Sequence, residues 1–306
     1  MTQPTSTKIE TRIGPHLALI AVQALFGTWP IAGKIVLRSL SPIGLVAFRI
    51  FGAALALIGL TWLLGFKRIE SRREYGQLAL YSLIGVVLNQ LLFVKGLAMT
   101  TVINATLISS TIPIFTLIVG VALGKEFITT RKVVGIALAA AGVIYLVNPA
   151  QADMSRDSLV GDGLLLVNSL CYGAYIALTK DLVRKYGALT VITWVFLLGN
   201  VVTLPLAVWQ VAPGTIVQMS GLTWVCLAYV ILFPTVTAYF LNGWALTRVD
   251  PSVVAIYIYL QPLFAFALAP LILGEWWNSR AWLAMALIFA GVFVVNRRRR
   301  LVPVAA

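Results

Sequence analysis

Neutral polar side chains are the groups that could do chemistry inside the long apolar stretches of this chain. Tyr81 and Asn89 lie eight residues apart in one stretch, and Tyr257 and Gln261 lie four apart in another, so each pair shares one helix face. Aromatic rings combined with amide groups suit a zwitterion that carries an apolar side chain. We therefore predict that six side chains face a central binding cavity: Tyr81, Asn89, Ser110, Tyr175, Tyr257 and Gln261.

The same polar side chains have a second interpretation that involves no ligand. Polar residues in apolar helices form hydrogen bonds between helices, worth about 0.6 kcal/mol each. Tyr and Trp residues near the ends of a membrane span can belong to interfacial belts. The number of these residues favours the cavity. Pro113 and Pro262, which follow the polar residues of the fourth and ninth stretches, favour it as well.

Arg49 is the one basic residue well inside an apolar stretch, about seven residues, or ~10 Å, from its start. A charged group at that depth is costly and is a functional candidate by default. We predict that it contacts a substrate carboxylate. The alternatives are that it bonds the carbonyl groups of helix ends, or that its long stem carries the charge to the interface.

Prolines and a glycine interrupt several of the apolar stretches. Pro30 and Gly33 lie in the first, and Pro234 lies in the eighth. Pro113 and Pro262 each free a backbone carbonyl about one turn earlier in the fourth and ninth. Because such positions weaken helix hydrogen bonding, we predict that all five act as hinges or gates.

Acidic residues fall in loops or at the ends of apolar stretches: Glu10, Glu70, Glu74, Glu126, Asp153, Asp157, Asp162, Asp181, Asp250 and Glu275. Coupling to protons or sodium commonly uses a carboxylate inside the membrane. The sequence therefore predicts uniport or substrate exchange. A phosphate-binding loop, a nucleophile–base pair and a metal-ligand spacing are also missing from the sequence, so we expect neither an enzyme nor a cofactor.

The composition sets the fold class. Of the 306 residues, 60% are apolar and 11% are charged, against about 25% charged in a soluble domain. The net charge of +13 is spread over loops, which argues against nucleic acid as a partner. Continuous apolar runs predict an all-α polytopic membrane protein in the lipid bilayer. Its ten expected spans are 15–36, 42–64, 76–97, 102–123, 131–148, 159–179, 189–210, 221–244, 252–273 and 280–296.

The distribution of Lys and Arg predicts the orientation. With ten spans, 17 of the 23 basic residues fall on the side of the N-terminus and 5 on the other. Basic loops stay in the cytoplasm. We therefore expect both termini to be cytoplasmic.

The two halves of the chain resemble each other. Gly96–Thr100 matches Gly243–Thr247, 147 residues later, and Ala141–Val143 recurs as Ala290–Val292, 149 residues later. The predicted units are 1–150 and 151–306, each with five spans. Because five is odd, the second unit enters the membrane from the opposite side. Inverted repeats around a site at mid-membrane are typical of carriers that work by alternating access. The alternative is a duplication kept for packing alone.

These residues resemble the EamA-type family of the drug/metabolite transporter superfamily over nearly the whole chain. The marks of the resemblance are Phe26-Gly27, Lys34, Phe48-Arg49, the segments Pro113…Leu123-Gly124-Lys125-Glu126 and Pro262…Leu273-Gly274-Glu275, and the two Ala-Gly-Val runs. The resemblance implies a ten-helix carrier without ATPase activity. Within the family the chain looks most like bacterial aromatic amino acid exporters.

The expected function is export of neutral or aromatic amino acids and related metabolites, as small-molecule substrates, across a bacterial inner membrane. A multidrug or nucleotide-sugar carrier is the first alternative, and a membrane scaffold without a transport cycle is the second. A nucleotide sugar would need several cationic groups in the cavity, and Arg49 is the one basic residue well inside an apolar stretch. Small residues in the fifth and tenth spans fit packing within a monomer or a homodimer seam.

Overall fold

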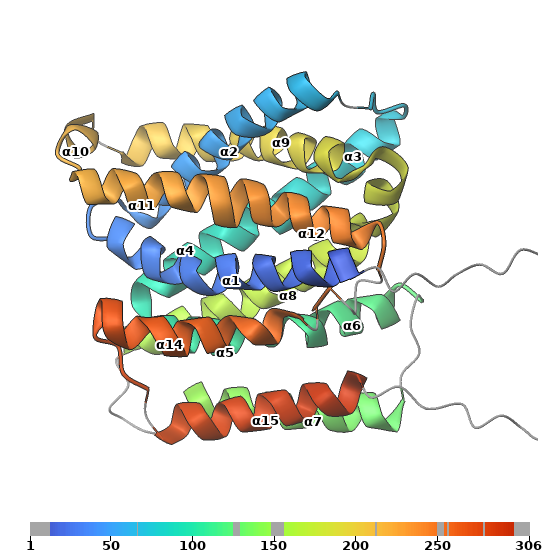
Figure 1. Ribbon diagram of the computed structural model, residues 1–306, viewed down its shortest axis with the longest axis vertical. Helices are drawn as coiled ribbons and strands as arrows, with labels where there is room; N and C mark the ends of the chain where they lie inside the picture. Colours follow the sequence, from blue (N-terminus) through green and yellow to red (C-terminus); the bar gives the residue numbers. More distant parts are fainter. Residues whose placement is uncertain are drawn as a thin grey trace, which may run out of the picture.

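The computed structural model describes residues 13–65, 67–124, 129–147, 156–211, 213–249, 254–255, 257–277 and 279–296. Helices, turns and short connections account for all of these residues, and none of them lies in a β-strand. Figure 1 shows the helices running side by side across the long axis of the molecule. The expected all-α class is therefore confirmed for the described part of the chain.

Seven spans in the described residues are long and apolar enough to cross a membrane. They are α1 (Ile13–Val36), α2 (Pro42–Leu64), α3–η1–α4 (Arg72–Ser82, Leu83–Leu88, Asn89–Met99), α5–α6 (Val102–Ser109, Ile112–Ala122), α8 (Arg156–Tyr186), α9 (Ala188–Gln210) and α11–η2–α12 (Gly221–Ile231, Leu232–Thr237, Ala238–Leu246). A short helix, α10 (Pro213–Val217), follows α9.

Shorter helices cover the other three expected spans. These are α7 (Thr130–Val147), η3 with α14 (Tyr257–Leu260, Gln261–Leu273) and α15 (Ser279–Asn296). In Figure 1, α7 and α15 lie side by side at one end of the long axis, next to the layer that holds α14 and α5. The count of ten spans stays a prediction.

Helix irregularities recur at nearly constant spacing. The π-helical turns η1 and η2 begin at Leu83 and Leu232, which are 149 residues apart. Helices α6 and α14 begin at Ile112 and Gln261, again 149 apart, and each has a proline in its first turn. Proline is tolerated there because the first helical N–H groups have no partner within the helix.

Close helix contacts recur at related positions. A Cβ atom on Gly27 of α1 would lie 2.9 Å from the carbonyl oxygen of Gln261 in α14. A Cβ atom on Gly173 of α8 would lie 3.0 Å from the carbonyl oxygen of Ile112 in α6. Only glycine permits such an approach of two backbones. Helix α1 therefore packs on α14 as α8 packs on α6.

Large apolar side chains cover the outside of the bundle. Trp62 near the end of α2 and Trp209 near the end of α9 are each 91% exposed. A soluble monomer rarely exposes a continuous apolar surface of this kind, whereas lipid is a suitable neighbour for it. The outer surface therefore agrees with the membrane location of the seven spans.

Candidate functional site

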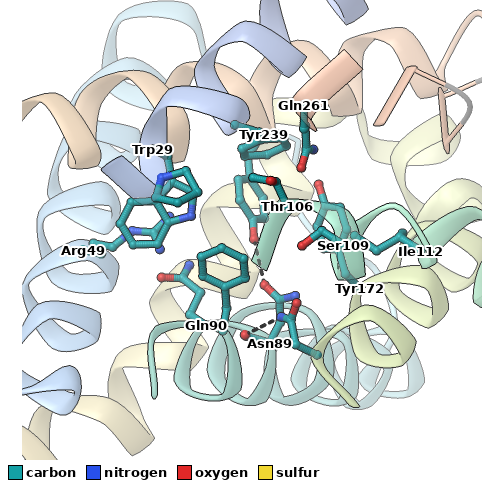
Figure 2. A pocket seen from close by; sticks show the side chains of 14 residues that line it. Trp29, Arg49, Asn89, Gln90, Thr106, Ser109, Ile112, Tyr172, Tyr239 and Gln261 are labelled. Carbon is teal, nitrogen blue, oxygen red and sulfur yellow. Dashed lines mark hydrogen bonds between the residues drawn. The ribbon is translucent and has the colours of Figure 1, made fainter. Parts of the chain in front are cut away.

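A cavity lies among α1, α2, α4, α5, α8, α12 and the first turns of α6 and α14 (Figure 2). The space among its side chains, counted together with its opening to the outside, is about 520 Å³, and about 60 Å³ of it is accessible to the centre of a water molecule. Its lining combines aromatic rings, amides, hydroxyls and one cation: Phe26, Trp29, Pro30, Arg49, Asn89, Gln90, Phe93, Thr106, Ser109, Ile112, Asn168, Tyr172, Tyr239 and Gln261.

Arg49 is the cationic group of this cavity. It is 3% exposed, and its guanidinium carbon lies 3.8 Å from the ring centroid of Trp29. Its Nε and Nη2 donate hydrogen bonds of 3.1 and 3.0 Å to Thr235 Oγ1. Among the described residues, no acidic side chain forms an ion pair with it. A buried cation is therefore balanced by one hydroxyl group and one aromatic face.

Pro234 explains why that hydroxyl group is available. Proline has no N–H, so the carbonyl group of Val230 loses its usual partner one turn later. Thr235 Oγ1 donates to this carbonyl oxygen over 2.7 Å. A hydroxyl group donates once and accepts twice, so the two hydrogen bonds from Arg49 complete its capacity. The π turn η2 thereby fixes the guanidinium at the wall of the cavity.

Amide side chains form a second polar group in the cavity. Asn168 Nδ2 donates to the backbone oxygen of Asn89 over 2.7 Å, and Gln261 Nε2 donates to Gln23 Oε1 over 2.7 Å. Gln90 is 2% exposed, and its Oε1 has no hydrogen-bond partner among the described residues. Buried amides are normally paired, so this oxygen marks a place for a polar ligand group.

Aromatic rings close one side of the cavity. The Tyr172 ring stacks on Tyr175 with a centroid distance of 6.0 Å, and Tyr239 meets Phe196 edge to face at 5.2 Å. Phe26 meets both Tyr172 and Tyr239 edge to face. Figure 2 shows Tyr239 between the side of Arg49 and the side of Tyr172. The rings form one continuous apolar wall.

The structure brings three of the seven predicted site residues together. Arg49, Asn89 and Gln261 line the cavity. Tyr175 does not line it but stacks behind Tyr172, which does.

The other three predicted site residues lie away from the lining. Ser110 is fully buried and donates to the backbone oxygen of Thr106. Tyr81 is buried in the apolar core. The hydroxyl group of Tyr257 is 2.7 Å from Nδ1 of His16, at an exposed position.

The predicted hinge residues lie at irregular points of the helices. Pro30 lines the cavity, and a Cβ atom on Gly33 would meet the Trp29 ring at 2.8 Å. Pro234 lies in η2, whereas Pro113 and Pro262 lie in the first turns of α6 and α14. Their role as hinges stays a prediction.

The sequence prediction did not select most of the lining residues, including Trp29, Gln90, Tyr172 and Tyr239. A usable signal was present for two of the missed residues. Phe26 precedes Gly27 and Tyr172 precedes Gly173, and these two glycines are 146 residues apart, close to the spacing of 147 to 149 residues in the repeat.

One acidic residue lies near a helix end, as expected, and is nevertheless buried. Asp162 is the seventh residue of α8 and is 1% exposed. Its Oδ2 accepts a 3.2 Å hydrogen bond from Asn104 Nδ2, and its Oδ1 has no partner among the described residues. The burial is explained by the turn between α4 and α5, which contacts this part of α8. Glu126 of the repeated motif lies outside the described residues.

Known proteins resemble this chain over nearly its full length. An Archaeoglobus fulgidus protein named as an uncharacterized transporter is 27% identical over 93% of this chain and 98% of its own length. The uncharacterized transporter YetK of Bacillus subtilis is 26% identical over 95% of this chain and 89% of its own length. A solved structure described as "Crystal structure of protein" shares the fold, with a TM-score of 0.68 at 15% identity over 94% of this chain and 97% of that chain.

The sequence model of the EamA-like transporter family matches twice, over residues 13–148 and 159–297. Together the two matches cover nearly all of the 306 residues. The chain therefore belongs to the EamA-like transporter family.

Proposed function

We propose that this protein is a secondary transporter that exports neutral and aromatic amino acids across a bacterial inner membrane. Two inverted five-helix units, 1–150 and 151–306, alternate the access of one central cavity, and both termini face the cytoplasm. The family and its relatives support a membrane transporter. The substrate is our inference from the cavity, and alternating access is our inference from the repeated helix irregularities. The direction follows the resemblance to exporters.

The unpaired charge of Arg49 carries the proposal. A guanidinium group has five N–H donors, and two of them reach Thr235. Placing a cation in a low-dielectric interior without an anion is unfavourable, and a substrate carboxylate would supply the missing charge and acceptors. A cavity with this composition therefore favours an anionic group at one end of its ligand.

The rest of the lining supports a zwitterion with an apolar side chain. Gln90 Oε1 is an unpaired acceptor that suits an ammonium group. The rings of Phe26, Tyr172 and Tyr239 offer apolar faces and edges to an aliphatic or aromatic side chain. These groups face one cavity and complement the three parts of a neutral amino acid.

The repeated irregularities support alternating access. The π turns η1 and η2 and the helix starts at Ile112 and Gln261 give each half the same weak points, 149 residues apart. Broken helices at corresponding places in two repeats are typical of the binding site in such carriers. If the halves exchange conformations, these points supply the flexibility on each side.

The alternatives fit the cavity less well. A multidrug carrier for organic cations would place its ligand beside the cation of Arg49. A nucleotide sugar carries phosphates, and Arg49 is the only basic residue among the fourteen that line the cavity. A scaffold without a transport cycle gives no reason for the unpaired Oε1 of Gln90 in the cavity. The predicted uniport or substrate exchange rested on the absence of a carboxylate near the centre of any span, and Asp162 lies near the end of α8.

Counterflow into liposomes tests the proposal. Vesicles that contain the purified protein and unlabelled L-phenylalanine should accumulate labelled L-phenylalanine. Phenethylamine, which lacks the carboxylate, should compete poorly, and tetraphenylphosphonium and a uridine diphosphate sugar should not compete. Arg49→Gln should remove counterflow, whereas Arg248→Gln, at an exposed position, should retain it. Equal competition by phenethylamine and L-phenylalanine would refute the role of the carboxylate.

A further inference from the structure

A groove at one end of the bundle combines two cations with apolar side chains. Lys67, in the connection after α2, and Arg248, directly after α12, supply the cations. The start of α9 lies between them and also lines the groove. The apolar part of the lining consists of Leu64, Leu189, Phe240 and Trp244. None of the described residues that line the groove is acidic, so it complements an anion.

Arg248 is held in position by its own helix. Its guanidinium carbon lies 4.0 Å from the ring centroid of Trp244. Its Nη1 donates hydrogen bonds of 3.0 Å to the backbone oxygen of Trp244 and 2.7 Å to Thr247 Oγ1. A guanidinium group has five N–H donors, so these two bonds leave the donors of Nε and Nη2. A fixed, planar donor set of this kind suits a phosphate group.

Lys67 is fixed at the opposite side of the groove. Its backbone N–H donates to Thr190 Oγ1 over 3.1 Å, and its Nζ donates to the backbone oxygen of Lys185 over 3.3 Å. Lys185 itself forms ion pairs with Glu70 and Glu74, at 3.0 and 2.7 Å. These two carboxylates therefore already have a cation, and the charge of Lys67 is left for a ligand.

The groove is continuous with the apolar outer surface of the bundle. Leu64, which lines it, is 68% exposed and follows the exposed residues Trp62 and Leu63 at the end of α2. Phe240 and Trp244 lie four residues apart and so share one face of α12. A phospholipid offers a phosphate to the two cations and acyl chains to these apolar side chains. Both parts of the groove therefore match one ligand.

The groove lies at the end of the bundle where the first span begins. A Cβ atom on Gly14, near the start of α1, would lie 3.6 Å from the ring of Trp244. In the proposed orientation this is the cytoplasmic end. Anionic lipids are found in the cytoplasmic leaflet, and basic pockets between spans bind their headgroups.

The cation pair has no counterpart in the other half of the sequence. A shift of 147 residues, the spacing of the repeat, replaces Lys67 by Gly214 and Arg248 by Thr101. In an inverted repeat, corresponding positions lie at opposite ends of the bundle and take equivalent parts in the transport cycle. A pair that is present at one end only fits a partner that is present on one side of the membrane only.

We propose that this groove binds one anionic phospholipid of the cytoplasmic leaflet, with its phosphate between Lys67 and Arg248. Lys67 belongs to the first half of the chain and Arg248 to the second, so the lipid joins the two halves. The lipid is a structural partner and not the substrate, because no described residue lines both the groove and the cavity. The inference takes only the orientation from the proposed function.

Native mass spectrometry of the full-length protein in detergent tests the site without any transport substrate. Palmitoyl-oleoyl phosphatidylglycerol should form an adduct, and the corresponding phosphatidylcholine at the same concentration should not. The double variant Lys67→Gln/Arg248→Gln should lose about tenfold of this binding. Arg72→Gln/Arg73→Gln removes the same charge from exposed positions of α3 and should retain it. Equal losses in the two double variants would overturn the proposal and leave only a general attraction to basic residues.

Thermal unfolding separates the lipid from free phosphate. A ligand that binds the folded state raises Tm, so phosphatidylglycerol should raise the Tm of the wild-type protein. Inorganic phosphate at the same concentration should not, because it offers nothing to the apolar part of the groove. An equal rise with inorganic phosphate would overturn the lipid as the ligand. Lys67→Arg/Arg248→Lys keeps both charges and should retain part of the rise.

Cross-linking of the wild-type protein locates the lipid without any variant. A phosphatidylglycerol that carries a photoreactive group next to its phosphate should label the segments 64–67 and 244–248. An excess of unlabelled phosphatidylglycerol should remove this label. Labelling of other segments in place of these two would overturn the site, even if the Gln variants failed to fold. If no amino acid is transported, the proposed substrate fails, and the label still decides the lipid site.

Discussion

The rings of Phe26 and Tyr172 meet edge to face in the wall of the cavity, with their centroids 6.3 Å apart. The two residues are 146 positions apart, and each precedes a glycine on which a helix from the other half packs. When two units are related by a twofold axis, a contact between equivalent residues lies on that axis. This pair therefore marks the axis of the proposed inverted repeat, and the cavity surrounds it.

Phe26→Leu should reduce the affinity for L-phenylalanine about fivefold and change the affinity for L-leucine little. The reason is that edge-to-face contacts between aromatic rings contribute about 0.5–1.5 kcal/mol beyond their burial. Competition in counterflow measures both affinities. Phe51→Leu, the same change at an exposed position of α2, should leave them unchanged. Equal losses for the two amino acids would show that Phe26 only maintains the packing.

Gly27→Ala and Gly173→Ala should destabilise the protein by similar amounts, about 1–3 kcal/mol each. Each added Cβ atom would lie within 3.0 Å of atoms in the helix opposite, so α1 must move from α14, or α8 from α6. Thermal unfolding in detergent measures the change in Tm. Gly59→Ala, where a Cβ atom would meet nothing within 4 Å, should maintain or raise Tm. A lower Tm for only one of Gly27→Ala and Gly173→Ala would contradict the equivalence of their contacts.

The spans were predictable because the bilayer imposes one length on every apolar run. The expected spans 42–64 and 102–123 nearly coincide with α2 and with α5–α6. The π turns were not predicted, because they depend on contacts between helices that are distant in sequence. Gly85 in η1, for example, lies against the ring of Tyr175 in α8.

These irregular turns also explain which site residues were predicted. Tyr81 and Asn89 share a face only in a regular α-helix, and η1 lies between them and rotates the following residues. Asn89 accordingly lines the cavity and Tyr81 does not. The 3₁₀ turn η3 separates Tyr257 from Gln261 in the same way. Arg49 lies in the uninterrupted helix α2, so its depth in the apolar stretch alone was sufficient to predict its place in the cavity.

Thr235→Val should destabilise the protein by about 1–3 kcal/mol, because it leaves the guanidinium group of Arg49 and the carbonyl group of Val230 without their shared partner. Thr235→Ser keeps the hydroxyl group and should restore most of the stability. Thermal unfolding of the purified variants in detergent measures both effects.

A matched control separates the cation from the helix geometry. Thr237 Oγ1 also donates to a carbonyl oxygen five residues earlier, that of Leu232, over 2.9 Å. None of the hydrogen bonds of Arg49 reaches it in the described structure. Thr237→Val should therefore cost less stability than Thr235→Val. Equal losses would assign the effect to the π turn and not to the buried cation.

Gly85→Ala should disrupt the aromatic wall of the cavity. A Cβ atom at this position would overlap the ring of Tyr175 and lie 2.8 Å from its Cβ, so the ring must leave its place on Tyr172. The single substitution should therefore lower both Tm and counterflow. Gly76→Ala changes a glycine of α3, in the same span, where a Cβ atom meets nothing within 4 Å. This variant should leave Tm and counterflow unchanged.

Combining Gly85→Ala with Tyr175→Ala tests whether the collision is the cause. Removing the ring opens the space that the new methyl group needs, so the double variant should be more stable than the sum of the single losses predicts. Groups in direct contact show interaction energies of about 0.5–3 kcal/mol in such cycles. Strictly additive changes in unfolding free energy would mean that Gly85 is required for the backbone of η1 and not for its contact with Tyr175.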